Sequence, residues 1–154
     1  MGRRRQGREF ALQSLYLTDV SGMSGAEAAT TVGAGSKLDT LTREFAKVLI
    51  DGTEDNRPSL DGHIRSVAKN WELGRMASVD RTLLRLASYE LLHCPDTPVS
   101  VIIDEALEIA KAYSSHDSSK FINGILDKIK LERIGGDSPI PKKSTKKKSP
   151  RKSG

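Results

Sequence analysis

The chain has 154 residues, of which 36% are hydrophobic and 29% charged, with a formal net charge of +5 and a single cysteine. This length fits one domain, and one cysteine excludes an intramolecular disulfide framework. No apolar run approaches the roughly 18 residues of a membrane span, and the basic N-terminus lacks the apolar stretch of a signal peptide, so we expect a cytoplasmic protein.

The charge is concentrated at the two ends of the chain. Residues 135–154 carry seven Lys or Arg against one Asp, and residues 1–9 carry four Arg against one Glu. The ends therefore contribute +6 and +3, which leaves residues 10–134 at −4. An acidic body with basic ends is expected to bind a polyanion at defined patches and not over its whole surface.

The first predicted helix, at about residues 4–19, has two chemically different parts. Four arginines repel one another at its start and should stay in water or meet phosphates: Arg3, Arg4, Arg5 and Arg8. An apolar stripe that should point inward follows: Ala11, Leu12, Leu15, Tyr16 and Val20. A helix packed at one end and cationic at the other is suited to gripping RNA. A solvated N-terminus that is basic by chance is the simpler alternative.

Glycines separate the first helix from the helices that follow. Residues 21–36 contain four glycines and predict a loop, with at most a helical turn around residues 26–29. A second helix is predicted at about residues 39–50 and should stop at Gly52. A third helix should begin after Pro58.

The middle of the chain contains the single tryptophan and the most apolar helix. Trp71 should fill the junction between neighbouring helices rather than bind a ligand. Ser78 is a suitable N-cap for a helix over residues 79–92. Pro95 and Pro98 should break that helix.

Two more helices complete the pattern. One is predicted at residues 101–113, and Asp117 or Ser118 should cap the last, at residues 120–134. Because each helix has one apolar face, each must pack on another, which predicts an all-α bundle of about six or seven helices. Residues 135–154, mostly Lys, Ser and Pro, have almost nothing to bury and should form a disordered tail.

The sequence offers little for catalysis. It has no P-loop, no nucleotide-binding glycine fingerprint and no Cys or His pairs at metal-ligand spacing, so we expect neither an enzyme nor a cofactor or metal site. The carboxylates of Asp104, Glu105 and Glu108 share one predicted helix, but such groups are common on solvated helix faces.

Several residues near helix starts are better candidates for binding. Tyr16 can pack its ring while its hydroxyl faces a partner. Asp80 suits the first turn of its helix through the helix dipole, and Arg81 and Arg85 lie one turn apart on one face, which could extend a basic patch.

The start of the last helix combines a cap, a cation and an aromatic ring: Asp117, Lys120 and Phe121. Backbone amides at a helix N-terminus favour anions such as RNA phosphates. An ordinary cap followed by a core phenylalanine explains the same pattern, so this alternative stays open.

Three separated stretches resemble the NusB family of bacterial transcription antitermination factors. The first is Arg3-Arg4-Arg5-x-x-Arg8-Glu9-x-Ala11-Leu12-Gln13, and the second is Val79-Asp80-Arg81-x-Leu83-Leu84-Arg85. The third is Ile103-Asp104-Glu105-Ala106, continuing into Lys120-Phe121-Ile122-Asn123-Gly124-Ile125-Leu126-Asp127. The resemblance covers about residues 3–130. Asp104 stands where the family often has Asn, and residues 21–36 and the tail match no family pattern.

The resemblance implies an all-α fold of two small helical bundles at residues 1–134, without catalysis. It implies binding to single-stranded boxA RNA of nascent transcripts, including ribosomal RNA leaders. The partners it implies are the ribosomal protein also called NusE and an antitermination complex on RNA polymerase. Family members occur as monomers or homodimers.

The resemblance also assigns residues. Carried over by motif, the RNA-facing candidates are Arg3, Arg4, Arg5, Arg8, Arg81, Arg85, Asp117, Lys120 and Phe121. Tyr16 and Asp80 match positions at or near the contact with the ribosomal protein. Phe121 is expected to stack on an unpaired base.

Two other functions remain open. The chain could be a non-catalytic relative of the NusB-like domain of ribosomal RNA methyltransferases; an intact enzyme would need a large α/β domain after the helices. It could also be a helical interaction module whose basic ends bind nucleic acid indiscriminately. A preference for boxA over scrambled RNA of equal length would separate the antitermination factor from both.

Overall fold

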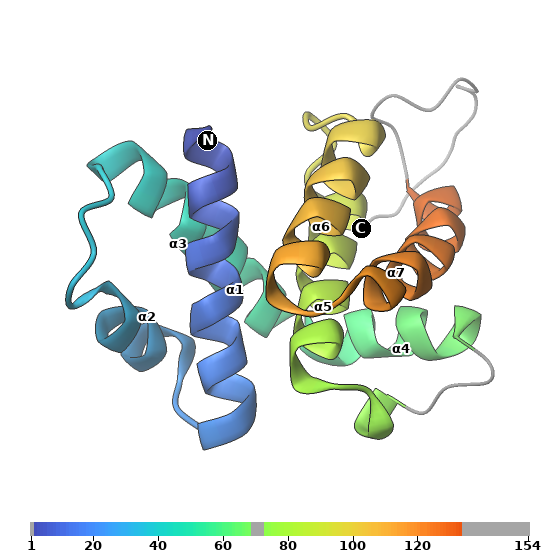
Figure 1. Ribbon diagram of the computed structural model, residues 1–154, viewed down its shortest axis with the longest axis horizontal. Coiled ribbons are helices and arrows are strands. Elements are labelled where there is room, and N and C mark those ends of the chain that lie inside the picture. The colour runs from blue at the N-terminus through green and yellow to red at the C-terminus, as the bar shows by residue number, and fades with distance from the viewer. Residues whose placement is uncertain (1, 69–72, 134–154) are drawn as a thin grey trace.

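The structure is a computed structural model that describes residues 2–68 and 73–133 (Figure 1). Within these ranges the regular elements are seven α-helices and two short 3₁₀ helices, which confirms the all-α fold. They are α1 (Arg3–Ser21), α2 (Gly25–Gly33), α3 (Thr40–Asp55), α4 (Arg57–Val67), η1 (Leu73–Arg75), α5 (Ser78–His93), α6 (Val99–Tyr113), α7 (His116–Ile129) and η2 (Lys130–Glu132). Among the described residues, no helix combines the length and apolar character needed to cross a membrane.

The helices form two groups that share one core. Figure 1 shows α1, α2 and α3 together on one side and α4 to α7 on the other. The two groups meet where α1 and α3 pack on α5. The core therefore continues from Leu12 and Leu15 of α1 to Leu84 and Leu91 of α5, all of which are at most 3% exposed. Burial of each such leucine contributes about 1.5–3 kcal/mol.

The apolar stripe of α1 is narrower than its sequence predicts. Ala11, Leu12 and Leu15 are buried as expected, but Tyr16 is 39% exposed and Val20 is 52% exposed. The helix instead turns Thr18 inward, with 6% exposure. The prediction that Tyr16 and Val20 point inward is therefore wrong.

The predicted loop at residues 21–36 contains a helix, α2. Its start is fixed by a capping box: the hydroxyl of Ser24 accepts the Glu27 N–H, and the Glu27 carboxylate accepts the Ser24 N–H, both at 3.1 Å. Ala28 of α2 is fully buried. Gly22 ends α1 with φ of 81° and donates its N–H to the carbonyl of Thr18. Gly22 thus ends α1, and the other glycines of this segment do not prevent the formation of α2.

Helix α3 does not stop at Gly52 but continues to Asp55. Gly52 faces the ring of Tyr89 on α5, and a Cβ atom at this position would overlap that ring. Glycine is therefore used here for close helix packing and not for helix termination. The predicted end of this helix is wrong for that reason.

Two predicted caps also differ from the structure. Ala77 occupies the cap position of α5, and Ser78 is already in the helix, where its hydroxyl accepts a hydrogen bond from Arg81. Ser115, not Asp117 or Ser118, caps α7, because its hydroxyl accepts the Ser118 N–H at 3.0 Å. Helix α7 ends at Ile129, earlier than predicted. Trp71 and the tail at residues 135–154 lie outside the described residues.

Candidate nucleic-acid interface

The start of α1 presents two exposed arginines. Arg3 lies 3.4 Å from the carboxylate of Asp39, but both side chains are highly exposed, so this ion pair contributes little to stability. Arg4 places its guanidinium 4.4 Å from the centre of the Phe45 ring on α3. These two guanidinium groups are accessible to a ligand in solution.

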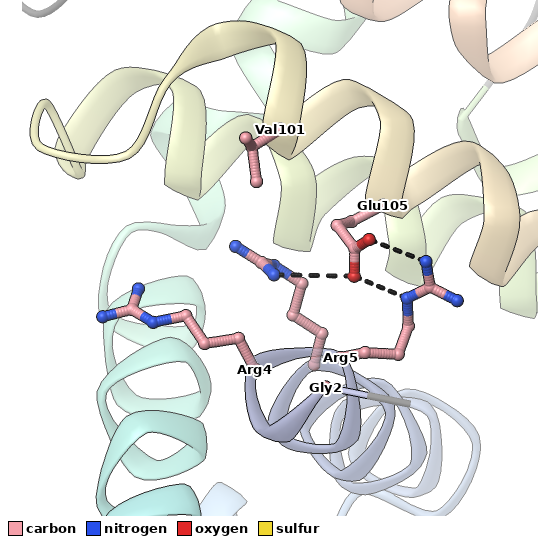
Figure 2. Close-up of a pocket in the computed structure, with 6 residues that line it drawn as sticks. Gly2, Arg4, Arg5, Val101 and Glu105 are labelled. Atoms are coloured by element: carbon pink, nitrogen blue, oxygen red, sulfur yellow. Dashed lines mark hydrogen bonds and ion pairs between the residues drawn. The ribbon is translucent and has the colours of Figure 1, made fainter.

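Arg5 is held by a carboxylate from α6. Its Nε and one terminal nitrogen donate to the two oxygens of Glu105 at 2.5 and 2.6 Å. Hydrogen bonds from Arg5 hold the pKa of Glu105 below its usual range, against a smaller opposing effect of burial. Figure 2 shows Arg5 reaching Glu105 on α6, whereas Arg4 extends away from Glu105. A pocket of about 350 Å³ lies here, lined by Gly2, Arg4, Arg5, Arg8, Val101 and Glu105.

Arg8 lies in the protein interior. It donates two hydrogen bonds of 2.9 Å to Glu90 of α5, and each side chain is only 3% exposed. The expectation that all four arginines avoid burial is therefore wrong for Arg8. The physical reason is that Glu90 neutralises it, and Glu90 is 82 positions away in the sequence.

A second group of arginines holds three helices together. Asp19 of α1 accepts hydrogen bonds of 2.6 to 3.1 Å from three arginines of α4 and α5, namely Arg57, Arg81 and Arg85. Arg85 also forms two hydrogen bonds with Asp61 of α4. Burial disfavours the charged carboxylate of Asp19, but the bonds from Arg81 and Arg85 outweigh it and lower its pKa.

This arrangement changes the interpretation of Arg81 and Arg85. They do lie on one face of α5, as their spacing predicts, but that face points at Asp19 and Asp61. The side chain of Arg85 is 8% exposed and that of Arg81 is 15% exposed. The expected extension of an exposed basic patch by these residues is therefore wrong.

The start of α7 packs on the start of α5. Asp80 is buried and accepts a hydrogen bond of 2.9 Å from the hydroxyl of Ser118. Asp117 and Lys120 are exposed, whereas Phe121 is half-buried and packs against the core. Tyr16 of α1 remains exposed. Of the two predicted partner-contact residues, Tyr16 is accessible and Asp80 is engaged internally.

Helices α1 and α6 run in the same direction and are bridged at two levels (Figure 1). Arg5 near the start of α1 contacts Glu105 in the middle of α6; farther along, the side-chain amide of Gln13 donates to the Tyr113 hydroxyl at 3.0 Å. We name the surface between these contacts the α1–α6 seam. The exposed arginines lie at one end of the seam, and the start of α7 follows its other end.

The carboxylates that determine which arginines are available could not be identified from the sequence. Glu90 and Glu105 pair with α1 across 82 and 100 positions. No local pattern marks such long-range pairs. The Phe45 ring lies under the Arg4 guanidinium, but in the sequence Phe45 is recognisable only as an apolar residue of its helix.

Comparisons with known proteins identify the family and the fold. A model of the NusB family matches residues 5–130. The transcription antitermination protein NusB of Elusimicrobium minutum is 46% identical over 140 residues, which is 90% of this chain and 100% of the relative. That of Geobacter sulfurreducens is 45% identical over 130 residues, 84% of this chain and 94% of the relative.

Two solved structures have the same fold. The structure of T. maritima NusB superposes with a TM-score of 0.79 at 37% identity, covering 84% of this chain and 92% of that one. A chain in a crystal structure of the antitermination factors NusB and NusE with double-stranded RNA gives a TM-score of 0.77 at 27% identity, covering 86% and 99%. On the family match and on these relatives, the chain belongs to the NusB family.

Proposed function

We propose that this chain is a transcription antitermination factor that acts in the cytoplasm without catalysing a reaction. It binds boxA-type single-stranded RNA of nascent transcripts, ribosomal RNA included, together with the ribosomal protein NusE on RNA polymerase. The observation that carries the proposal is the match of this fold, over 86% of the chain, to a chain solved in a complex of NusB, NusE and double-stranded RNA. The antitermination role of the curated relatives supports it.

The geometry suggests a division of roles among the predicted site residues. Exposure favours Arg3, Arg4 and Lys120 for direct contact with phosphates, and Asp117 is exposed one turn before Lys120. Phe121 offers a partly exposed ring for base stacking. Three predicted arginines that are buried or nearly buried act by holding the helices in place: Arg8, Arg81 and Arg85.

The chain is proposed to bind its two partners along one surface. We call the start of α1 with Arg3, Arg4 and Arg5 the arginine end. Tyr16 lies in α1 between the arginine end and the start of α7, and offers NusE an exposed aromatic ring with a polar tip. RNA that contacts this chain and NusE at the same time would be bound more tightly than RNA that contacts only one of them, even if no new contacts form. The lysine-rich residues 135–154 would add phosphate attraction that is independent of sequence and screened by salt.

The double variant Arg3→Ala/Arg4→Ala tests the arginine end directly. We expect weaker binding to labelled boxA RNA and a salt dependence that is shallower by about 0.7 for each phosphate that the variant no longer neutralises. The far-UV circular dichroism should not change, because both side chains are exposed.

Lys47→Ala is the matched control, because Lys47 is an exposed cation on α3 whose side chain is 74% exposed. It should leave RNA affinity nearly unchanged. Equal affinity of the arginine double variant and the parent for boxA would contradict the proposed interface. Equal affinity of the parent for boxA and for scrambled RNA would contradict the proposed function and favour an indiscriminate nucleic-acid-binding module.

A further inference from the structure

Arg5, one of the four arginines at the start of α1, already holds an anion in the absence of RNA. Both oxygens of Glu105 accept hydrogen bonds from its guanidinium group, in the two-point geometry that a phosphate would also adopt. Carboxylate and phosphate therefore compete for the same donors. Figure 2 shows this pair inside the pocket at the arginine end.

The charges around the pocket leave little attraction for a second anion. Arg8 is neutralised by Glu90 and lies 3.8 Å from Glu105 at its nearest ion-pair contact. Among the six described residues that line the pocket, Arg4 is the cation that pairs with an aromatic ring instead of a carboxylate. Glu105 is therefore the anion that meets Arg5 and Arg8 in this pocket, while Arg4 is turned toward Phe45.

The two carboxylate–arginine pairs differ in their capacity to open. The Arg8–Glu90 pair is buried, and separating it would leave two charges without partners in the interior. The Arg5–Glu105 side chains are 26% and 22% exposed, so water can solvate each group after separation. Among the arginines that line the pocket, Arg5 is thus the one that can exchange its carboxylate for a phosphate.

We propose that Glu105 is an internal competitor for Arg5 that limits the affinity of this chain for any RNA backbone. The proposal rests on the proposed function, because it requires RNA to reach the arginine end. A competitor of this kind keeps RNA binding by the chain alone weak. Tight binding then depends on contacts that a second protein supplies.

The variant Glu105→Gln tests this directly in the full chain. Glutamine keeps an oxygen that can accept from Arg5 but removes the negative charge. We expect the affinity for labelled scrambled single-stranded RNA to rise about fivefold at low salt, with a salt dependence steeper by about 0.7. The affinity for boxA RNA should rise by the same factor, so the ratio of the two affinities stays constant.

Glu108→Gln is the matched control, because Glu108 lies one turn farther along α6, is 53% exposed and pairs with Lys111 outside the pocket. It makes the same change in net charge and should raise the affinity for RNA much less. Far-UV circular dichroism and thermal unfolding would confirm that both variants fold. An unchanged or reduced affinity of the folded Glu105→Gln protein would overturn the proposal.

A pair of further variants separates competition from simple orientation of Arg5. Arg5→Gln leaves Glu105 only its longer contact of 3.8 Å with Arg8 and should weaken RNA binding about fivefold. Arg5→Gln/Glu105→Gln removes both charges and should return the affinity to within about twofold of the parent. If the double variant binds as weakly as Arg5→Gln, Arg5 is a direct contact that Glu105 merely orients, and the proposal fails. The boxA-to-scrambled ratio of the parent tests the proposed function separately.

Discussion

Arg8 and Glu90 show how strongly a single residue's role depends on its partner. The pair crosses from α1 to α5 through the core, with two hydrogen bonds of 2.9 Å and both side chains 3% exposed. Removing one partner leaves the other charge buried and unpaired, which is far more costly than losing the attraction itself. Arg8 is therefore expected to stabilise the fold and not to contact RNA.

Replacing Arg8 by Met should lower the free energy of unfolding by about 3–5 kcal/mol. The double variant Arg8→Met/Glu90→Met should recover most of this loss, because no unpaired charge then remains in the core. Urea denaturation measures both values. If Arg8→Met is as stable as the parent protein, Glu90 must find another partner or water in the variant.

Helix packing explains why the helix predicted to stop at Gly52 continues beyond it. Gly52 has the sequence signal of a helix end, yet α3 passes through it because the ring of Tyr89 on α5 occupies the space of a side chain. Gly62 of α4 is the opposite case, since a Cβ atom there would meet nothing within 4 Å. Both glycines lie inside helices, so the two positions form a matched pair.

Gly52→Ala should destabilise the protein by about 1–3 kcal/mol, because the added methyl group forces α3 and α5 apart. Gly62→Ala should stabilise it by about 0.5–1 kcal/mol through helix propensity alone. Thermal unfolding of the two variants checks both signs. A gain in stability at Gly52 would contradict the close contact with Tyr89.

Asp19 connects α1 with α4 and α5, and this connection should be sensitive to acid. Its pKa in the folded protein lies below the ordinary value of 3.8, so its contribution to stability is complete above about pH 4 and is lost as the pH falls through the folded pKa. Asp19→Asn should therefore lower stability at pH 7 and flatten the loss of stability below about pH 4. Parallel pH–stability curves for variant and parent would contradict this linkage.

The sequence was sufficient for the fold class and for most helices, because their apolar faces recur at helical spacing. It was not sufficient for α2, because the glycines of residues 21–36 predicted a loop although Ser24 and Glu27 form a capping box there. It was also not sufficient to sort the arginines, because a charge run shows which residues are cationic but not which carboxylate each one meets. Glu90 and Glu105 lie on other helices and become neighbours of α1 only through tertiary packing.

At the scale of the whole molecule, one surface extends from the exposed arginines along the α1–α6 seam toward the start of α7. Five arginines of the described helices pair with carboxylates of other helices and so hold the helices together: Arg5, Arg8, Arg57, Arg81 and Arg85. A chain with this arrangement should bind RNA weakly alone and more tightly with a second protein that extends the surface. Such dependence of RNA binding on a second protein is expected of an adaptor.

The most direct test is a titration of labelled boxA RNA, and of scrambled RNA of equal length, with this chain in the presence and absence of NusE. The account predicts weak binding to boxA by the chain alone, and a large gain on adding NusE that scrambled RNA does not share. Equal affinities for the two RNAs under both conditions would contradict the central claim that this helical protein recognises one class of unpaired transcript with a protein partner.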